Sequence, residues 1–179
     1  MQEIMNAIKK RRSIRSYENT PVPTEALHLM LEAGGLAPSG KNGQPWRFSV
    51  IQENARLKDE IADLSAYRRW VKEAPCLIAV WLDTKSSYDV SKDLMGIGAC
   101  IENILLMAEA QNLGTCWLGE ILKAEETIKA LLNIPADFTL TAVLTVGYIK
   151  TAGTQPARRS VKENLIASDR LSSIEEGEN

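Results

Sequence analysis

Two groups of arginines are the side chains of this sequence best suited to hold a charged ligand. Arg11, Arg12 and Arg15 follow the first helical pattern, and Arg158 and Arg159 form a second group far along the chain. The guanidinium group is permanently charged and makes paired hydrogen bonds, which suits it to phosphate. Either group alone is better explained as a solvated basic surface. Together with a loop rich in polar side chains, they indicate the phosphate end and the heteroaromatic end of one ligand.

That loop, GLAPSGKNGQPW (35–46), comes close to the phosphate-loop pattern of nucleoside triphosphatases. Gly35, Gly40 and Lys41 have the required spacing, but Asn42 stands where a Ser or Thr hydroxyl must reach magnesium. A helical pattern precedes the loop and a strand pattern follows it, the reverse of the order that a phosphate loop needs. We therefore reject a triphosphatase. A glycine-rich turn is the alternative interpretation, but it does not explain the polar residues Ser39, Lys41, Asn42 and Gln44.

The other residue types offer little catalytic chemistry of their own. His28 is the single histidine, and the apolar residues around it on its helix indicate that it faces solvent. The three cysteines, Cys76, Cys100 and Cys116, lie in separate apolar segments without a CxxC pair, so we expect reduced core thiols and no metal site. If the protein is an enzyme, a bound cofactor therefore carries the chemistry.

The overall composition predicts one soluble domain covering residues 1–179. Of the 179 residues, 45% are hydrophobic and 25% are charged, and the formal net charge is −2. This charge argues against nucleic acid as a partner. No apolar run resembles a signal peptide or is long enough to span a membrane. We expect a cytoplasmic location, no membrane partner, and a polar C-terminal tail over about 165–179.

The patterning along the chain predicts an α+β fold of the three-layer sandwich type. A central mixed, mostly antiparallel sheet flanked by helices is expected, because helices and strands do not alternate as strict βαβ units. Expected helices cover 2–13, 24–35 with Thr24 as N-cap, 54–64, 91–112 and the stretch from 125 to before Pro135, and expected strands cover 47–52, 76–82, 113–119 and 138–149. Residues 66–75 are expected to form a basic, aromatic connector.

The longest predicted helix, 91–112, is expected to lie at the centre of the domain. Small residues cover much of its surface, and its wide apolar face can be approached from several sides. This face is formed by Leu94, Ile97, Ile101, Ile104, Leu105 and Ala108.

Four segments of the sequence resemble motifs of the nitroreductase family of FMN-dependent oxidoreductases. They are RRSIRSY (11–17), APSGKNGQPWRF (37–48), GIGACIENILLMAEAQNLGTCWLG (96–119) and the stretch from VGYI to ARRSVKE (146–163). The segments occur in the family's order and span nearly the whole chain. The resemblance implies a nitroreductase-like fold and a homodimer with two FMN sites at the subunit interface.

The resemblance also implies roles for the two arginine groups. Arg11 is expected to hold the FMN phosphate, and Arg12 and Ser13 to contact the phosphate and the ribityl chain. Arg158 and Arg159 are expected to complete the phosphate clamp. The family's usual Arg-Lys-Pro tail is not reproduced, because Ser160 follows Arg159, so the closer of these two arginines stays open.

At the ring end, the resemblance implies contacts from three places in the chain. Arg15 is expected near flavin N1 and O2, where a cation stabilises the negative charge that reduction creates. Leu118 and Gly119 are expected under the ring, with the Gly119 backbone N–H near N5. The loop residues expected to line the flavin, some of them that of the partner subunit, are Pro38, Ser39, Gly40, Asn42 and Gln44.

The reaction implied by the resemblance is a ping-pong transfer of two electrons. NADH or NADPH gives a hydride to flavin N5, and a small planar acceptor such as a nitroaromatic or a quinone then takes the electrons. One alternative is a non-catalytic protein that binds or stores flavin, and another is a specialised family reaction such as reductive dehalogenation. The usual substrate lid is shortened to about Ser65–Glu73. Within it, Tyr67, Arg68, Arg69 and Trp70 either cover the flavin or pack at the dimer surface.

Overall fold

A four-stranded antiparallel sheet forms the centre of the computed structural model, which describes residues 2–167. The strands lie in the order β1 (Trp46–Ile51), β2 (Cys76–Asp83), β4 (Phe138–Tyr148) and β3 (Leu113–Leu118). The two central strands are rich in β-branched and aliphatic residues, and β2 is buried along almost its whole length. The last residues of the predicted polar tail, 168–179, lie outside the described residues.

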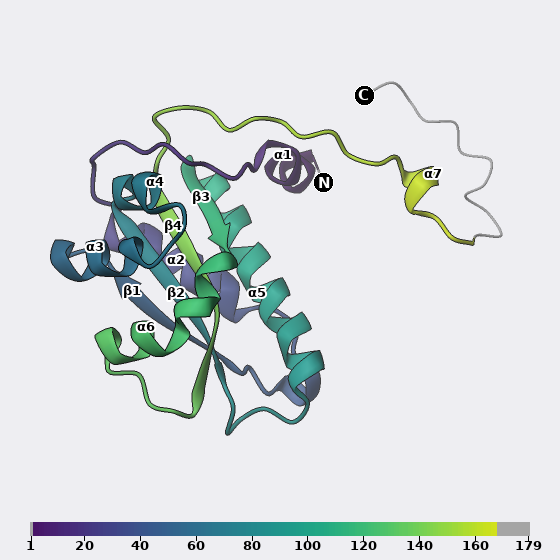
Figure 1. Cartoon of the computed structure of the whole chain (residues 1–179). Coiled ribbons are helices and arrows are strands. Elements are labelled where there is room, and N and C mark those ends of the chain that lie inside the picture. Colours follow the sequence, from purple (N-terminus) through teal and green to yellow (C-terminus); the bar gives the residue numbers. More distant parts are fainter. Residues whose placement is uncertain (1, 168–179) are drawn as a thin grey trace.

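Helices cover both faces of this sheet and make three layers (Figure 1). One face packs against α2 (Thr24–Gly35) and α5 (Val90–Ala110). The other packs against α3 (Ala55–Asp63), α4 (Arg68–Glu73), the 3₁₀ turn η2 (Glu120–Ala124) and α6 (Glu125–Leu132). Side chains along β2 point alternately to the two faces of the sheet and so belong to two hydrophobic cores. Ile78 and Val80 pack on the α5 side, and Ala79 and Trp81 pack on the other side. The predicted three-layer α+β fold is confirmed, with pairing between the four strands antiparallel throughout rather than mixed.

Helix α5 is the buried central helix that the sequence predicts. Ile97, Ile101 and Ile104 are at most 2% exposed, and the Asp89 side chain caps the helix by accepting from the Lys92 N–H. Leu94 is the exception to the predicted face, because 44% of it is exposed. Leu94 lies near the start of α5 and belongs to neither hydrophobic core.

Two local predictions were wrong. Residues 66–75 contain the helix α4 rather than a plain connector. Val71 and Ala74 are fully buried, and the Lys58 ammonium donates to the carbonyl groups of Lys72 and Ala74, which satisfies the end of this short helix. Thr24 is the first residue of α2 rather than its N-cap; Pro23 takes the cap position and makes no side-chain hydrogen bond.

The first helix and the C-terminal segment project from this three-layer body. Helix α1 (Gln2–Lys10) has no buried residue, and the segment after β4 runs past it to the short helix α7 (Val161–Asn164) (Figure 1). Apolar side chains on both are exposed: Ile4 by 69%, Val161 by 71% and Ile166 fully. Among the described residues, no helix is both long enough and apolar enough to cross a membrane.

Candidate functional site

The segment that carries the first three arginines is fixed along the edge strand β3. Ser13 forms a parallel bridge with Thr115, and the Ile14 N–H donates to the Thr115 carbonyl at 2.8 Å. Tyr17 is 3% exposed, and its hydroxyl lies 2.7 Å from both the Ile14 carbonyl and Thr145 Oγ1. Burial raises the pKa of this phenol above its usual range, so it stays protonated and keeps the segment in place.

Gly114 and Gly153 allow three segments of the chain to pack closely here: residues 12–14, strand β3 and the segment that follows β4. A side chain at Gly114 on β3 would come within 2.7 Å of Ile14 and 2.8 Å of Ile149. A side chain at Gly153 would come within 2.9 Å of the Arg12 Cβ and 3.2 Å of the Ser13 carbonyl. Residues 12–14 therefore lie between β3 and the returning C-terminal segment, which brings the second arginine group beside the first.

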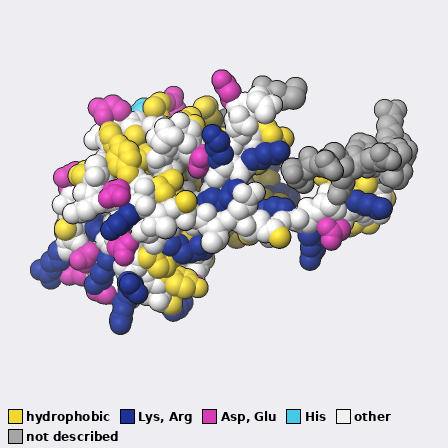
Figure 2. All heavy atoms as spheres, turned by 90° about the horizontal axis from the view of Figure 1, so that it is seen from above, with side chains coloured by type: hydrophobic (Ala, Val, Ile, Leu, Met, Phe, Trp, Pro, Cys, Tyr) yellow, Lys and Arg dark blue, Asp and Glu magenta, His cyan; other side chains and the backbone are white. Residues whose placement is uncertain are grey.

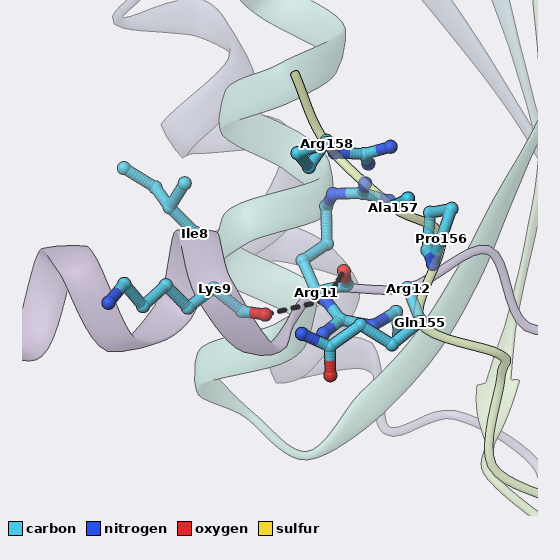
Figure 3. A pocket seen from close by; sticks show the side chains of 8 residues that line it. All are labelled: Ile8, Lys9, Arg11, Arg12, Gln155, Pro156, Ala157 and Arg158. Carbon is cyan, nitrogen blue, oxygen red and sulfur yellow. Dashed lines mark hydrogen bonds between the residues drawn. The ribbon is translucent and has the colours of Figure 1, made fainter. Parts of the chain in front are cut away.

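The two arginine groups meet at a cavity of about 680 Å³, in the range of natural ligand sites (Figure 3). It is lined by Ile8, Lys9, Arg11, Arg12, Gln155, Pro156, Ala157 and Arg158. Arg11, Arg12 and Arg158 are thus brought together, whereas Arg159 is not among the lining residues. Arg12 donates to the Lys9 and Arg11 carbonyls, which fixes its guanidinium at the wall.

The charge of this cavity suits a phosphate group. Lys9 and three arginines line it, and Glu102 reaches only Arg11, at 3.7 Å between Oε1 and Nε. Figure 2 shows Lys and Arg side chains gathered where the projecting segments meet the main body. Arginine donors in a partly enclosed space make charge-assisted bonds to phosphate oxygens. The site therefore fits the phosphate of a nucleotide cofactor.

Arg15, Leu118 and Gly119 are not among the residues that line this cavity. Arg15 is exposed and lies over the Trp70 ring, with 5.8 Å between its guanidinium carbon and the ring centroid. Leu118 is buried at the end of β3, whereas Gly119 is exposed, and a side chain added there would meet no atom within 4 Å. The backbone at Gly119, directly after β3, is therefore accessible to a planar ligand.

The polar loop forms a strained turn at the start of α5, away from the cavity (Figure 1). Lys41, Asn42 and Gln44 have φ of 54°, 55° and 46°, in the left-handed region that non-glycine residues rarely adopt. The Ser39 hydroxyl holds the turn by accepting from the Gln44 N–H at 3.0 Å. Within one chain, the predicted loop residues Pro38, Ser39, Gly40, Asn42 and Gln44 are therefore not joined to the arginine cavity.

Lys41 packs against an aromatic ring instead of pointing to a phosphate. Its ammonium lies 5.0 Å from the centroid of the Tyr88 ring, and Lys92 lies 5.4 Å from the same centroid. The Tyr88 ring also covers Gly40, so a side chain there would displace the ring. The resemblance of this loop to a phosphate loop is accidental.

Sequence reasoning missed two features of the site. Lys9 and Gln155 line the cavity, but neither belongs to a motif; the run of basic residues ending at Arg12 was the available signal for Lys9. Glu120 was also missed: its carboxylate accepts from the Ser65 hydroxyl and from the Ala66 N–H. Its position directly after Gly119 could have drawn attention to it.

The histidine and the cysteines stand apart from this site. His28 is exposed, as predicted. Burial raises the pKa of the Cys76 and Cys100 thiols to about 12, and all three cysteines are buried and unpaired. Over residues 2–167, no three His, Cys, Asp or Glu side chains come together as a metal site.

Comparisons with known proteins define the class of this site. The sequence model of the nitroreductase family matches residues 8–68 and 62–148. A protein of Archaeoglobus fulgidus with the provisional name NADH dehydrogenase/NAD(P)H nitroreductase is 35% identical over 84% of this chain and 87% of its own. The crystal structure of a provisionally named nitroreductase of Desulfovibrio desulfuricans in complex with FMN is 38% identical, with a TM-score of 0.87 over 92% of this chain and 96% of that one. The chain belongs to the nitroreductase family and is an oxidoreductase of that family.

A more distant relative has another named activity. The iodotyrosine deiodinase of Nematostella vectensis is 28% identical over 82% of this chain and 67% of its own length. Family membership alone therefore does not define the electron acceptor.

Proposed function

We propose that this protein binds FMN and passes two electrons from NADH or NADPH to a small planar acceptor such as a nitroaromatic or a quinone. The observation that carries the proposal is the cavity in which Arg11, Arg12 and Arg158 converge from opposite ends of the described chain. The segment that carries Arg11 and Arg12 pairs with Thr115 of β3, and the exposed Gly119 directly follows this strand. The relatives named NAD(P)H nitroreductase and found with FMN support the same cofactor and electron donor.

The chain's own residues bind and orient rather than react. Arg11, Arg12 and Arg158 hold the phosphate, and Ser13 contacts the adjoining ribityl chain. When bound, FMN supplies the redox chemistry, taking a hydride at N5 from the nicotinamide and giving two electrons to the acceptor that replaces it. With FMN bound, Arg15 would favour the negative charge that reduction creates near N1 and O2, and the Gly119 N–H would be the backbone donor available to N5. Arg159 has a secondary role, because it does not line the cavity.

We also propose that the active form is a homodimer with FMN at the subunit interface. Three exposed apolar groups support this: Ile4, Met5 and Ile8 on α1, Met95 on α5 with 75% exposure, and Val161 on α7. The loop around Asn42 and Gln44 does not line the cavity of its own chain, so a partner's loop completes the ring site. A cytoplasmic location is supported by the three unpaired cysteines.

A screen of acceptors with both nicotinamides tests this function. FMN-loaded protein is mixed with NADH or NADPH and with a quinone, a nitroaromatic or an iodinated phenol, and nicotinamide oxidation is followed. Continuous oxidation with a quinone or nitroaromatic supports the proposal. Halide release from the iodinated phenol alone favours the dehalogenation alternative, which the deiodinase relative makes worth testing. FMN binding without turnover of any acceptor favours flavin storage.

A further inference from the structure

The short helix α4 is anchored at both ends by hydrogen bonds to other parts of the chain. At its start, Ser65 and Ala66 donate to the Glu120 carboxylate, and the Tyr67 N–H donates to Ser65 Oγ at 3.0 Å. At its end, the Lys58 ammonium donates to two carbonyls at 2.9 Å each. Because Glu120 directly follows Gly119, the anchor of α4 adjoins the backbone proposed to face flavin N5.

An aromatic and cationic stack extends from α4 to the other edge of this site. The Tyr67 and Trp70 rings stack with 5.7 Å between centroids and 28° between planes. Arg15 lies over Trp70 at 5.8 Å. The stack and the Glu120 anchor thus connect α4 both to Arg15, proposed near N1 and O2, and to the residue that follows Gly119.

The two positive charges at the start of α4 do not stabilise the helix. Arg68 and Arg69 stand in its first turn, where the positive end of a helix disfavours cations. Both are exposed, and neither has a carboxylate partner among residues 2–167. Glu120, which anchors the residues before α4, is already bonded to Ser65, Ala66 and Lys123.

We propose that the wall formed by Tyr67, Arg68, Arg69 and Trp70 selects planar aromatic acceptors that carry a carboxylate or sulfonate group. The aromatic pair provides a flat apolar surface, and the two free guanidinium groups attract the anionic substituent. The inference rests on the proposed oxidoreductase function and defines its substrate class. For a quinone acceptor, one NADH or NADPH is oxidised and the quinone gains two electrons and two protons, while its acidic substituent is unchanged.

Matched pairs of acceptors test this selectivity. The ratio of kcat/KM for 4-nitrobenzoate to that for 4-nitrobenzyl alcohol is measured for the FMN-loaded wild type and for the double variant Arg68→Gln/Arg69→Gln. Comparing this ratio between the wild type and the double variant cancels the difference in intrinsic reactivity between the two acceptors. We expect it to fall about tenfold in the double variant, since each removed charge contact is worth a few-fold. The control Arg56→Gln removes an exposed arginine on α3 that is paired with Glu60, and it should leave the ratio unchanged.

Measuring the binding of aromatic ligands tests the inference independently of catalytic turnover. Calorimetric titration compares 2-naphthoate with the neutral 2-naphthamide on the wild type and the double variant. Tighter binding of the carboxylate that disappears in the double variant supports the inference, even if no acceptor is reduced and the proposed function fails. Equal binding of the two compounds, or a preference that the double variant keeps, overturns it. An unchanged kcat/KM ratio in an active double variant overturns it as well, while leaving the oxidoreductase function intact.

Discussion

Arg11 and Arg158 line the same cavity, although one follows the first helix and the other follows the last strand. The contact between these distant segments depends on Gly153, which lies against Arg12 and Ser13. The C-terminal segment thereby completes a site that begins at the N-terminal segment. Cofactor binding and the docking of the C-terminal segment are expected to be coupled, because each arranges the same arginines.

The first prediction separates the arginines that line the cavity from the one that does not. Arg11→Ala should weaken FMN binding by about 1.5–3 kcal/mol, the usual worth of a charge-assisted hydrogen bond, and Arg158→Ala should behave alike. Arg159→Ala is the matched control and should change the affinity far less. Quenching of FMN fluorescence on addition of apoprotein gives the dissociation constants. Equal losses for Arg158→Ala and Arg159→Ala would show that the cavity is not the phosphate site.

The second prediction concerns the packing that fixes the arginine segment on β3. Gly114→Ala should lower the free energy of unfolding by about 1–3 kcal/mol, because the new methyl group overlaps Ile14 and Ile149. It should also weaken FMN binding, since residues 11–15 are displaced. Gly35→Ala is the control, because a methyl group there meets nothing within 4 Å. Denaturant unfolding and FMN titration measure both effects; an unaffected affinity in a destabilised Gly114→Ala protein would separate the segment from the site.

The third prediction is a pH dependence that originates at Tyr17. Tyr17→Phe should cost about 1 kcal/mol near pH 7, because the hydrogen bonds to Ile14 and Thr145 are lost. Burial raises the pKa of this phenol in the folded state, so its contribution is complete below the unfolded pKa of about 10 and declines as the pH rises above it. Tyr17→Phe cannot ionise and should lose less stability than the wild type between about pH 9 and 11. Urea unfolding measures the stability of both proteins over this pH range. Equal losses of stability in the wild type and in Tyr17→Phe would contradict this role of Tyr17.

The fourth prediction tests the proposed dimer. Met95→Glu places a charge on the exposed face of α5 and should yield a monomer that binds FMN more weakly. Val50→Glu, on the edge strand β1 at the other side of the sheet, should remain dimeric. Light scattering after size-exclusion chromatography gives the mass of each protein. A wild type that is monomeric while fully loaded with FMN would rule out an interfacial site.

The sequence was most informative where a feature depends on residue type and local pattern. The α+β class, the strands and the buried face of α5 follow from periodicity. The phosphate role of the arginine groups follows from guanidinium chemistry and stays a prediction. That Arg158 and not Arg159 lines the cavity could not be predicted, because it depends on how the C-terminal segment packs against residues 12–14. Helix α4 was not predicted because its stability comes from the distant residues Lys58 and Glu120 rather than from its own six residues.

The most direct test of the account is titration of purified apoprotein with FMN, read by visible absorbance and followed by anaerobic addition of NADH or NADPH. We predict saturable binding that is weakened by Arg11→Ala and not by Arg159→Ala. Loss of the oxidised flavin absorbance on addition of nicotinamide should follow, with recovery when a quinone is added. A wild-type protein that takes up no FMN, or bound flavin that neither nicotinamide reduces, would contradict the account.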